Sequence, residues 1–572
     1  MAVDPWGVVL AEAERLKQGA EAAANVTGVA VPLETPPEGM GDVAFATFPY
    51  AKHLRRKPDD IAREFVSSMP ATPLLSVREA VGGYVNLRLD LKEFASLVLE
   101  SAAEAGESYG RLPPNDVKVL LEHTSVNPTG PIHVGRARNP IIGDALARIM
   151  SMAGYSVTTE YLVNDVGRQM VILYFGVRNL SSDEVQPPER DKEDFRLVKY
   201  YQEMNKILEQ GTDIDEQIND LIARFENGDV HLTKDIRGVA ERVLSGLLDS
   251  LNRIDVQIDR FFWESDLILG GSARQVVERL RGQFEEEDGA LFLDLAPYGI
   301  KGEDTRWFLT RKDGTTLYPT RDIAYHLDKF GRCDVAINVL GEDQKLGQQQ
   351  LKVGLKLIGA EKEPEAVFYA FVALPEGRMS TREGRVVTLD DLIDESVERA
   401  AEEVRKRRQD LLPEKVSEIA EIVGLGALRY NIVRLQPEKK IVFKWEEALN
   451  FEGNSAPFLQ YAHARTCGIL SKAGDIGVPE PLALSHPSEH RLVKVLGQFP
   501  HQIFLAAENR RPHIIAAYAY EAASQFNIFY RDCQVLHEQE PLRSTRLALV
   551  ETSRTVLRNA LECIGLRAPA EM

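Results

Sequence analysis

The sequence predicts an α/β fold built around a doubly wound parallel sheet, with an N-terminal α+β module before it and a C-terminal all-α domain after it. Three observations lead to this prediction. Short β-branched and apolar runs alternate with helical patterns between about residues 111 and 400. Nearly all of the chain beyond about residue 400 has helical periodicity, and the first 110 residues combine helical stretches with a strand-like one. Alternation of strands and helices is typical of a parallel sheet covered on both faces.

The length supports a division into three domains, because 572 residues exceed a single hydrophobic core. We expect an N-terminal module over residues 1–110, a central domain over 111–400 and a helical domain over 401–572. Residues from about 180 to 260 are charged and helical, and we interpret them as an insertion between two sheet crossovers. No apolar signal segment opens the chain, and no apolar run approaches the ~20 residues that span a bilayer. A cytoplasmic protein that binds no membrane is therefore expected.

The overall charge by itself argues against a nucleic-acid partner. Lys and Arg total 68 against 87 Asp and Glu, a net charge of −19, and an acidic surface repels a phosphate backbone. Positive charge nevertheless clusters at residues 405–408 and 510–511, where a local basic face could bind RNA. Such a run is more often a solvated helix face. The four cysteines lack C-x-x-C spacing, so neither a zinc site nor a disulfide framework is predicted.

The first 110 residues begin with an amphipathic helix. A Pro-rich break covers residues 33–41, residues 41–46 have the composition of a turn and a buried strand, and residues 84–89 alternate as a strand does. Another helical stretch follows. This mixture predicts a small α+β module.

The strand–loop–helix unit that follows is the main candidate for a nucleotide site. Residues 117–121 are a strand-type run, and apolar side chains recur at helical spacing over 142–150. Between them, Pro128 and Gly130 fix the loop, and Gly135 lets a ligand approach the backbone. The helix start offers unpaired amide donors to a phosphate. Many α/β proteins begin a helix this way without binding phosphate, so the loop alone leaves both interpretations open.

The rest of the central domain continues the alternation. Strands are predicted over 155–163, 334–339 and 366–372, and a helix over 351–358. These elements indicate a parallel sheet. Beyond residue 400 the helical pattern breaks only at 411–413 and across 475–487.

Two distant segments carry a family resemblance. His133-Val134-Gly135-Arg136 resembles the HIGH signature of class I aminoacyl-tRNA synthetases, and Arg378-Met379-Ser380-Thr381-Arg382 resembles their KMSKS loop. Residues 122–144, 374–395 and 451–465 are similar to arginyl-tRNA synthetases of the archaeal type, and the resemblance spans nearly the whole chain. It implies a Rossmann-like, HUP-type catalytic domain, an N-terminal module that contacts the tRNA elbow and a DALR-type anticodon-binding domain.

The resemblance also implies the reaction and its partners. L-arginine is activated with ATP to arginyl-adenylate, and the arginyl group then passes to the 3′-terminal adenosine of tRNA(Arg), with release of AMP and pyrophosphate. Mg²⁺ is expected on the ATP phosphates without a fixed protein metal site, and the family is mostly monomeric. Positioning and cancellation of developing negative charge are expected to supply most of the acceleration.

The two signatures supply the candidate catalytic and ATP-binding residues. By the resemblance, His133 donates to the phosphates and Gly135 leaves room for adenine. Arg136 stands where a second histidine is usual, and the KMSKS lysines are replaced by Arg378 and Thr381. Related enzymes offset such a loss with a lysine where this chain has Gly130, so Arg136 and Arg382 are candidates for the missing charge, although Arg382 could be a solvated loop residue. The catalytic set is His133, Gly135, Arg136, Arg378, Met379, Ser380 and Arg382, and the ATP-binding set is Thr129, His133, Gly135, Arg136, Met379 and Ser380.

Selection of arginine over lysine requires a planar carboxylate facing the guanidinium group. Residues 318–322 are similar to the family segment whose tyrosine and aspartate line that pocket. Asp322 is the expected guanidinium partner and Tyr318 a wall one helical turn earlier, whereas a buried tyrosine and a capping aspartate are the structural alternatives. The resemblance adds Asn127, Glu160, Asn164 and Gln344 to the arginine site.

The candidate tRNA-binding residues lie near the C-terminus. Phe458, Tyr461, His463 and Arg465 combine aromatic rings with a cation at helical spacing, which suits stacking on unpaired anticodon bases and contact with phosphate. An aromatic stripe at this spacing can equally belong to a hydrophobic core, and for Phe458 the two interpretations have equal weight.

Three other functions remain open from the sequence. The chain could be a class I synthetase for another amino acid, which the Tyr318 and Asp322 pair argues against. It could be a non-catalytic paralogue that binds tRNA, a possibility raised by Arg136 and Thr381. It could also be a small nucleotidyltransferase of the HIGH type, but such enzymes need neither terminal domain.

Overall fold

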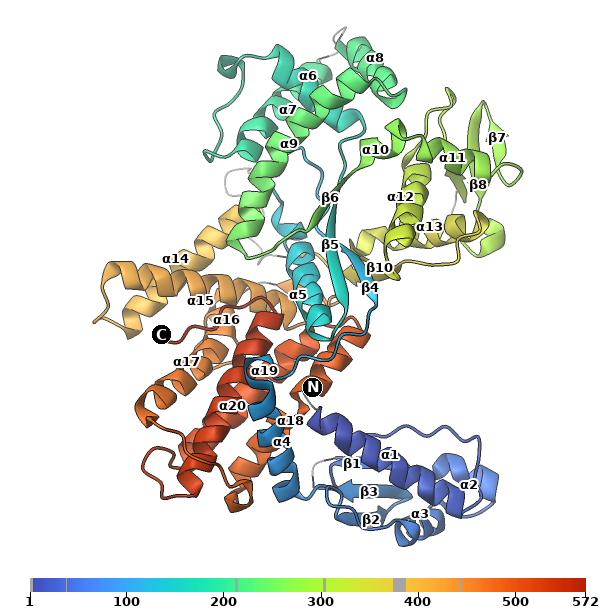
Figure 1. Ribbon diagram of the computed structural model, residues 1–572. Helices are drawn as coiled ribbons and strands as arrows, with labels where there is room; N and C mark the ends of the chain where they lie inside the picture. The colour runs from blue at the N-terminus through green and yellow to red at the C-terminus, as the bar shows by residue number, and fades with distance from the viewer. Residues whose placement is uncertain (1–3, 38, 211–213, 302–304, 374–386, 443) are drawn as a thin grey trace.

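The computed structural model describes residues 4–37, 39–210, 214–301, 305–373, 387–442 and 444–572. Its centre is a five-stranded sheet in which every pairing is parallel, in the order β11-β10-β4-β5-β6 (Figure 1). The strands are β4 (Lys118–Glu122), β5 (Ser156–Val163), β6 (Arg260–Trp263), β10 (Val335–Gly341) and β11 (Glu365–Tyr369). The chain winds outward from β4 on one side and from β10 on the other. The predicted doubly wound parallel sheet is therefore confirmed, with its switch point between β4 and β10.

The two faces of the sheet are covered by different helices, because neighbouring side chains of a strand point to opposite faces. Leu121 and Ile337, which are paired in register, belong to the core that includes Ile142 and Leu146 of α5 (Arg138–Met152). On the other face, Phe262 belongs to a second core with residues of α12 (Tyr318–Arg332) and α13 (Lys345–Leu357).

Two excursions leave the sheet. The first, between β5 and β6, is helical and contains α6 (Arg168–Asn179), α7 (Glu193–Glu209), α8 (Ile214–Glu226) and α9 (Val230–Arg253). The second, between β6 and α12, contains α10 (Glu264–Leu269), α11 (Ser272–Arg279) and an antiparallel sheet of β7 (Glu285–Glu287), β8 (Ala290–Asp294) and β9 (Arg306–Phe308). The helical excursion rises above the central sheet in Figure 1. The small antiparallel sheet was not anticipated from the sequence.

The predicted strand over 366–372 was wrong at its end. β11 stops at Tyr369, the Ala370 N–H donates to the Pro437 carbonyl at 2.9 Å, and β12 (Val372–Ala373) pairs instead with β13 (Ile441–Val442). A single apolar run is thus divided between two sheets. The division depends on residues more than 60 positions away, which the local pattern could not reveal.

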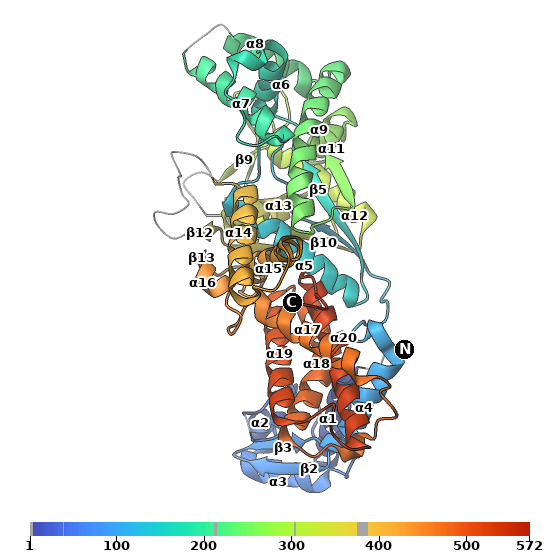
Figure 2. The same cartoon turned by 90° about the vertical axis from the view of Figure 1, so that its left-hand side faces the viewer.

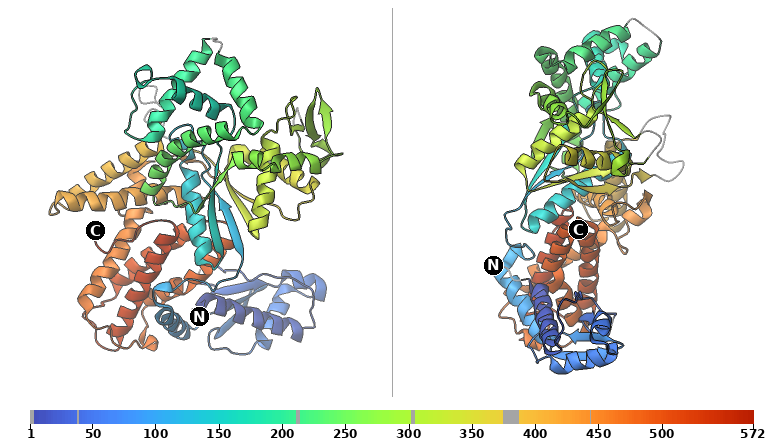
Figure 3. Two further views of the ribbon diagram at one scale, coloured as in Figure 1. Left: turned by 45° about the horizontal axis from the view of Figure 1, so that its top comes forward. Right: turned by 90° about the vertical axis from the view of Figure 1, so that its right-hand side faces the viewer.

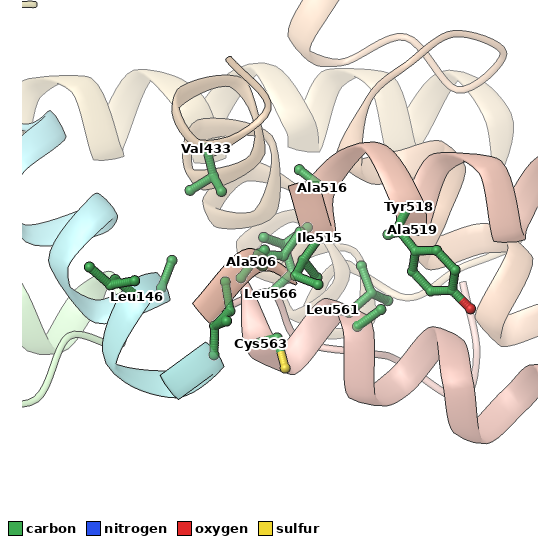
Figure 4. Packing of buried hydrophobic residues seen from close by; sticks show 14 of the residues in the cluster. Leu146, Val433, Ala506, Ile515, Ala516, Tyr518, Ala519, Leu561, Cys563 and Leu566 are labelled. Atoms are coloured by element: carbon green, nitrogen blue, oxygen red, sulfur yellow. The ribbon is translucent and has the colours of Figure 1, made fainter. Parts of the chain in front are cut away.

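The C-terminal part is helical, as predicted. Its helices are α14 (Leu389–Arg407), α15 (Pro413–Val433), α16 (Trp445–Ala448), α17 (Ala456–Ala473), α18 (Pro487–Glu508), α19 (His513–Asp532) and α20 (Leu542–Cys563). Figure 4 shows Leu146 of α5 in the same apolar cluster as Val433, Ile515, Leu561 and Leu566, so this helical domain shares an apolar core with the sheet domain.

The N-terminal module packs against the C-terminal helices, and α18 contacts both α1 and α4. The module contains α1 (Pro5–Ala23), β1 (Val43–Ala46), α2 (Phe48–Leu54), α3 (Pro58–Ser68), β2 (Val77–Val81), β3 (Tyr84–Arg88) and α4 (Leu91–Ala105). Figure 2 and the right-hand view of Figure 3 show an elongated molecule in which the C-terminal helices stand between this module and the central sheet. Among the described residues, no helix combines the length and the apolar character needed to cross a bilayer.

Candidate functional site

A cavity of about 1180 Å³ lies at the carboxyl ends of β4 and β10, next to the switch point of the sheet. Its lining includes Thr129, His133 and Arg136 from the loop after β4, together with residues of α7 and of the start of α14. A side pocket of about 340 Å³ shares Glu122, Asn164, Tyr318 and Gln344 with it. Ligands of doubly wound sheets bind at such a switch point. The two adjoining spaces form the candidate site.

His133 is held in a defined orientation. It precedes the short helix η2 (Val134–Arg136), and its Nδ1 accepts a hydrogen bond from the Gly135 N–H at 2.9 Å. Burial and the neighbouring Arg136 charge lower the pKa of His133. The ring is therefore neutral near pH 7, and Nε2 carries its proton because Nδ1 acts as the acceptor. A Cβ atom at Gly135 would lie 3.0 Å from His133 Nδ1, so glycine at this position keeps the capping geometry open.

Arg136 lies at the cavity edge, with its guanidinium carbon 5.8 Å from the centre of the Phe371 ring. Arg378, Met379, Ser380 and Arg382 of the second signature lie outside the described residues. The described chain after them borders the first loop directly. The Val134 N–H donates to the Val387 carbonyl at 3.0 Å, and the Leu389 N–H donates to the Ile132 carbonyl at 2.8 Å. The start of α14 is thus fixed to the His133 loop by backbone hydrogen bonds.

Five of the six predicted arginine-site residues lie together. Asn164, Tyr318, Asp322 and Gln344 line the side pocket, and Asn127 lines the large cavity. Asp322 has 43% of its side chain exposed, and its Oδ1 lies 3.0 Å from His326 Nδ1. Tyr318 is one helical turn earlier on α12, as predicted, and is exposed.

Glu160 does not join this group, and its assignment to the arginine site needs correction. It lines neither cavity, and its fully buried carboxylate accepts hydrogen bonds from Tyr325 Oη at 2.8 Å and from Arg332 at 2.8 and 3.1 Å. The residue lies three positions before the end of β5. Its charge is neutralised inside the protein rather than presented to a ligand.

Two acidic residues of the site were missed from the sequence. Glu122 ends β4 and lines both spaces, and its carboxylate contacts Lys329 Nζ and accepts from Ser125 Oγ at 2.9 Å. Glu264 follows β6 directly and lines the side pocket, where its carboxylate pairs with Arg321. Burial raises the pKa of Glu264. The signal that could have found Glu122 is its position at the carboxyl end of a predicted parallel strand. Glu264 had no such signal, because the strand that it follows, β6, was not predicted.

Asn164 binds the Glu264 carboxylate. With its amide nitrogen turned toward Glu264, it donates to Glu264 Oε2 at 2.8 Å and to the Val166 carbonyl at 2.9 Å. This orientation satisfies both ends of the amide, and amide orientation is assigned from such networks. Asn164 therefore orders the floor of the side pocket.

The helical excursion is tied to α14 by a group of ion pairs that we call the insertion joint: Arg190, Lys192 and Arg253 facing Asp390, Asp391 and Asp394. Lys192 Nζ lies 2.9 Å from Asp390 Oδ2, and the Asp390 side chain is only 2% exposed. Arg190 contacts Asp391 at 2.7 Å and Asp394 at 2.5 Å. Acidic side chains in the first turn also suit the positive end of the α14 dipole. The joint holds the start of α7 beside the His133 loop.

The predicted tRNA-binding residues separate into two groups. Tyr461 is 44% exposed, and the Arg465 guanidinium lies 4.8 Å from its ring centre and 5.4 Å from that of Tyr530. Phe458 is half-buried and packs against Tyr520, with ring centres 5.5 Å apart.

The assignment of His463 to tRNA binding needs correction, because its side chain faces the interior. It is 4% exposed, and its Nδ1 lies 2.9 Å from the Pro569 carbonyl oxygen. It cannot offer its ring to RNA without a rearrangement of the C-terminal segment. Tyr530, exposed beside Arg465, is an additional surface aromatic that the sequence analysis did not select.

The residues described here contain no group of three or more His, Cys, Asp or Glu side chains arranged to hold a metal ion. Mg²⁺ carried by the phosphates of a nucleotide would not need such a group, because it binds through few protein carboxylates and keeps several waters.

Comparisons with known proteins agree along the whole chain. Residues 99–445 match the family described as tRNA synthetases class I (R), catalytic domain. Residues 12–89 match the arginyl tRNA synthetase N terminal domain, and residues 459–572 match the DALR anticodon binding domain.

Individual relatives cover nearly the full length. An arginine–tRNA ligase of Methanocella arvoryzae is 46% identical over 527 residues, which are 92% of each chain, and one of Methanocaldococcus jannaschii is 40% identical over 94% of this chain and 95% of its own. The solved Thermus thermophilus arginyl-tRNA synthetase superimposes with a TM-score of 0.83 at 28% identity, covering 98% of this chain and 99% of that one. The chain therefore belongs to the class I arginyl-tRNA synthetases.

Proposed function

We propose that the protein is an arginine–tRNA ligase that forms arginyl-adenylate from L-arginine and ATP and transfers the arginyl group to the 3′-terminal adenosine of tRNA(Arg). The observation that carries this proposal is that two spaces adjoin each other. A cavity beside His133 shares Glu122, Asn164, Tyr318 and Gln344 with a pocket that contains carboxylates. One holds the nucleotide and the other the amino-acid side chain.

Arginine selection rests on the carboxylates of the side pocket. Glu264 is paired with Arg321 and Glu122 with Lys329, so protein cations already balance these two. Asp322 faces the pocket with a half-exposed carboxylate, and a guanidinium group can bind it through two parallel hydrogen bonds. Lysine offers a single ammonium that cannot match this geometry. Tyr318 covers the aliphatic part of the substrate, and Asn127, Asn164 and Gln344 hold its backbone groups.

The chemical step needs the arginine carboxylate to attack the α-phosphorus of ATP while pyrophosphate leaves. A neutral His133 donates from Nε2 to phosphate oxygens, and Arg136 offers a permanent positive charge at the same edge. Mg²⁺ would bind through the ATP phosphates and shield their charge. We assign Thr129, Gly135, Met379 and Ser380 to the nucleotide, and Arg378 and Arg382 to charge compensation.

Each of the three domains has its own role. Residues 1–110 contact the tRNA elbow, residues 111–400 catalyse the reaction, and residues 401–572 bind the anticodon. Tyr461 and Arg465 present an aromatic ring and a cation on the surface of α17, which suits stacking on a base. Phe458 contributes mainly to packing. We expect the enzyme to act as a monomer in the cytoplasm, where its tRNA substrate is found.

The test is aminoacylation of total tRNA with each amino acid in turn. Only arginine should be charged, and arginine-dependent pyrophosphate exchange should appear only when tRNA(Arg) is present. Charging with another amino acid would favour a different synthetase. Equal, negligible rates for the wild type and His133→Ala would favour a non-catalytic tRNA-binding protein, and nucleotide transfer without tRNA would favour a small nucleotidyltransferase.

A further inference from the structure

The described lining of the large cavity contains few positive charges for a space that must hold phosphate. Glu122, Glu189 and Asp391 contribute carboxylates, whereas among the described lining residues the Lys and Arg side chains are Arg136 and Lys199. His133 is neutral near pH 7 because its pKa is lowered. Phosphate oxygens are bound in proteins mainly by Arg, Lys and backbone N–H groups. A phosphate in this part of the site therefore has few cations to bind other than Lys199.

Lys199 comes from the helical excursion, on α7. Packing fixes its position, because its neighbour Val198 lies against Gly130 of the His133 loop. A Cβ atom at Gly130 would be 2.8 Å from Val198 Cγ2, so a larger residue would push α7 away. The insertion joint holds the same helix at its start through Lys192. The excursion is thus a wall of the cavity, and Lys199 is the cation on that wall.

The Lys199 ammonium is buried and still has N–H donors for a ligand. Its side chain is 10% exposed, and Nζ lies 2.6 Å from Glu189 Oε1. An ammonium has three N–H donors, so a phosphate oxygen can bind while Glu189 keeps one. Glu189 lines the cavity as well. The ion pair holds Lys199 at the wall of the cavity.

We propose that Lys199 binds phosphate in the large cavity, either of ATP or of the tRNA 3′ end. The proposal rests on the proposed function, which brings both into this space. A lysine suits the role because its compact charge sits on a flexible stem that can move from a carboxylate to a phosphate. Lys199 then contributes positive charge that the first loop lacks at Gly130.

The first test is aminoacylation kinetics of Lys199→Met and Lys199→Arg, with Lys206→Met as the matched control. Lys206 is on the same helix, is 57% exposed and pairs with Glu203 at 2.8 Å. Loss of one charged hydrogen bond should raise the KM for ATP or for tRNA(Arg) about tenfold or more in Lys199→Met. The KM that rises identifies the source of the phosphate. Lys199→Arg should retain most of the affinity, and the Lys206→Met variant should match the wild type.

Glu189→Gln separates phosphate binding from a merely structural ion pair. If Lys199 binds phosphate, removal of the competing carboxylate leaves the affected KM unchanged or lower. If the pair only supports the fold, Glu189→Gln and Lys199→Met raise that KM alike. Three results would overturn the assignment. They are an equal rise of that KM in both variants, unchanged KM values in Lys199→Met, and an effect confined to kcat.

A measurement on the unsubstituted protein covers the case in which Lys199→Met does not fold. ATP or tRNA(Arg) should protect Lys199 from reductive methylation, read by mass spectrometry, whereas Lys206 serves as the internal reference. Equal methylation of Lys199 with and without both ligands would overturn the assignment. If the wild type fails to charge tRNA with arginine, the proposed function fails; if it charges normally and Lys199 does not respond, only this inference fails.

Discussion

We assign His133 two separate tasks, one at each ring nitrogen. Nδ1 accepts a hydrogen bond from the Gly135 N–H at 2.9 Å, and in the proposed mechanism Nε2 donates to the phosphate oxygens of ATP. Two substitutions can therefore separate the two tasks, because each keeps a polar atom at the position of only one ring nitrogen. Asn reaches the position of Nδ1, and Gln reaches that of Nε2.

We predict that His133→Gln retains more activity than His133→Asn, although Asn preserves the cap. His133→Ala should lower kcat about 100-fold or more, as expected for loss of one donor to developing charge. Single-turnover adenylate formation measures all three. A better rate for Asn than for Gln would mean that the cap, rather than the Nε2 donor, dominates.

His123 makes the stability of the fold depend on pH. It is buried, Gly143 packs against its ring, and burial lowers its pKa from 6.5 to about 4. Because the unfolded chain takes up this proton first as the pH falls, the free energy of unfolding decreases between about pH 6.5 and pH 4.

Over that pH range, the free energy of unfolding of the His123→Gln variant should decrease by about 3 kcal/mol less than that of the wild type. Urea unfolding at several pH values provides the measurement. The other histidines with lowered pKa are present in both proteins, so they cancel in the difference. Parallel curves for the two proteins would contradict the burial of a neutral His123.

Asp322 should control the affinity for arginine. We predict that Asp322→Asn raises the KM for arginine about 10–100-fold, because a charged hydrogen-bonding partner is lost. Asp328→Asn is the matched control, since this residue is on the same helix with a side chain 40% exposed and faces Arg332 instead of the pocket. Equal effects of the two substitutions on the KM for arginine would remove Asp322 from the site.

At the scale of elements, the insertion joint connects a wall of the cavity to the His133 loop. α7 contributes Val198 and Lys199 to that wall, and α14 is bonded through its first residues to the loop itself. Asp390 lies at the centre, in contact with Lys192, Ser250 and Arg253. Movement of either helix changes the shape of the site.

Asp390→Asn should lower the free energy of unfolding by about 3 kcal/mol, because it leaves buried Lys192 with less compensation. It should also raise the KM for ATP several-fold. Glu489→Gln breaks a similarly buried pair with Arg546, with 0% and 9% exposed side chains, in the C-terminal helices. That control should be destabilised to a similar degree but retain the KM for ATP. Identical kinetics in the two variants would show that the joint supports only stability.

Most elements of the central sheet could be predicted because their signals are local. Strands over 117–121, 155–163 and 334–339 correspond to β4, β5 and β10, since apolar runs bounded by turns are encoded in a few neighbouring residues. The predicted end of β11 was wrong because Ala370, which follows the strand, donates to the Pro437 carbonyl, and Pro437 is far away in the chain. The helical insertion over about 180–260 was likewise visible, but its contacts and the second excursion were not.

At the scale of the whole molecule, Arg429 joins the C-terminal helices to the sheet domain. It is buried on α15, pairs with Asp144 of α5 and donates to the carbonyl groups of Ile254 and Ile564. Asp144 also pairs with Arg148. One side chain therefore links three parts of the chain.

Arg429→Met should lower the free energy of unfolding by about 3–5 kcal/mol, because Asp144 loses a buried partner. It should also separate the unfolding of the C-terminal helices from that of the sheet domain. Calorimetry should then show two transitions, with anticodon-dependent tRNA binding lost at the lower one. A single transition at the wild-type temperature would contradict this role, and Arg434→Met, a partly exposed arginine just after the same helix, is the control.

The sequence by itself determined the parallel sheet with most of its strands, the loop of His133 and the family, because periodicity and short motifs reside in neighbouring residues. Only the tertiary structure decided which side chains meet in one space. It shows that Glu122, Glu264 and Lys199 line the site and that Glu160 and His463 are buried. Burial and ion pairing depend on segments that are distant in the chain, and these become neighbours only when the chain folds.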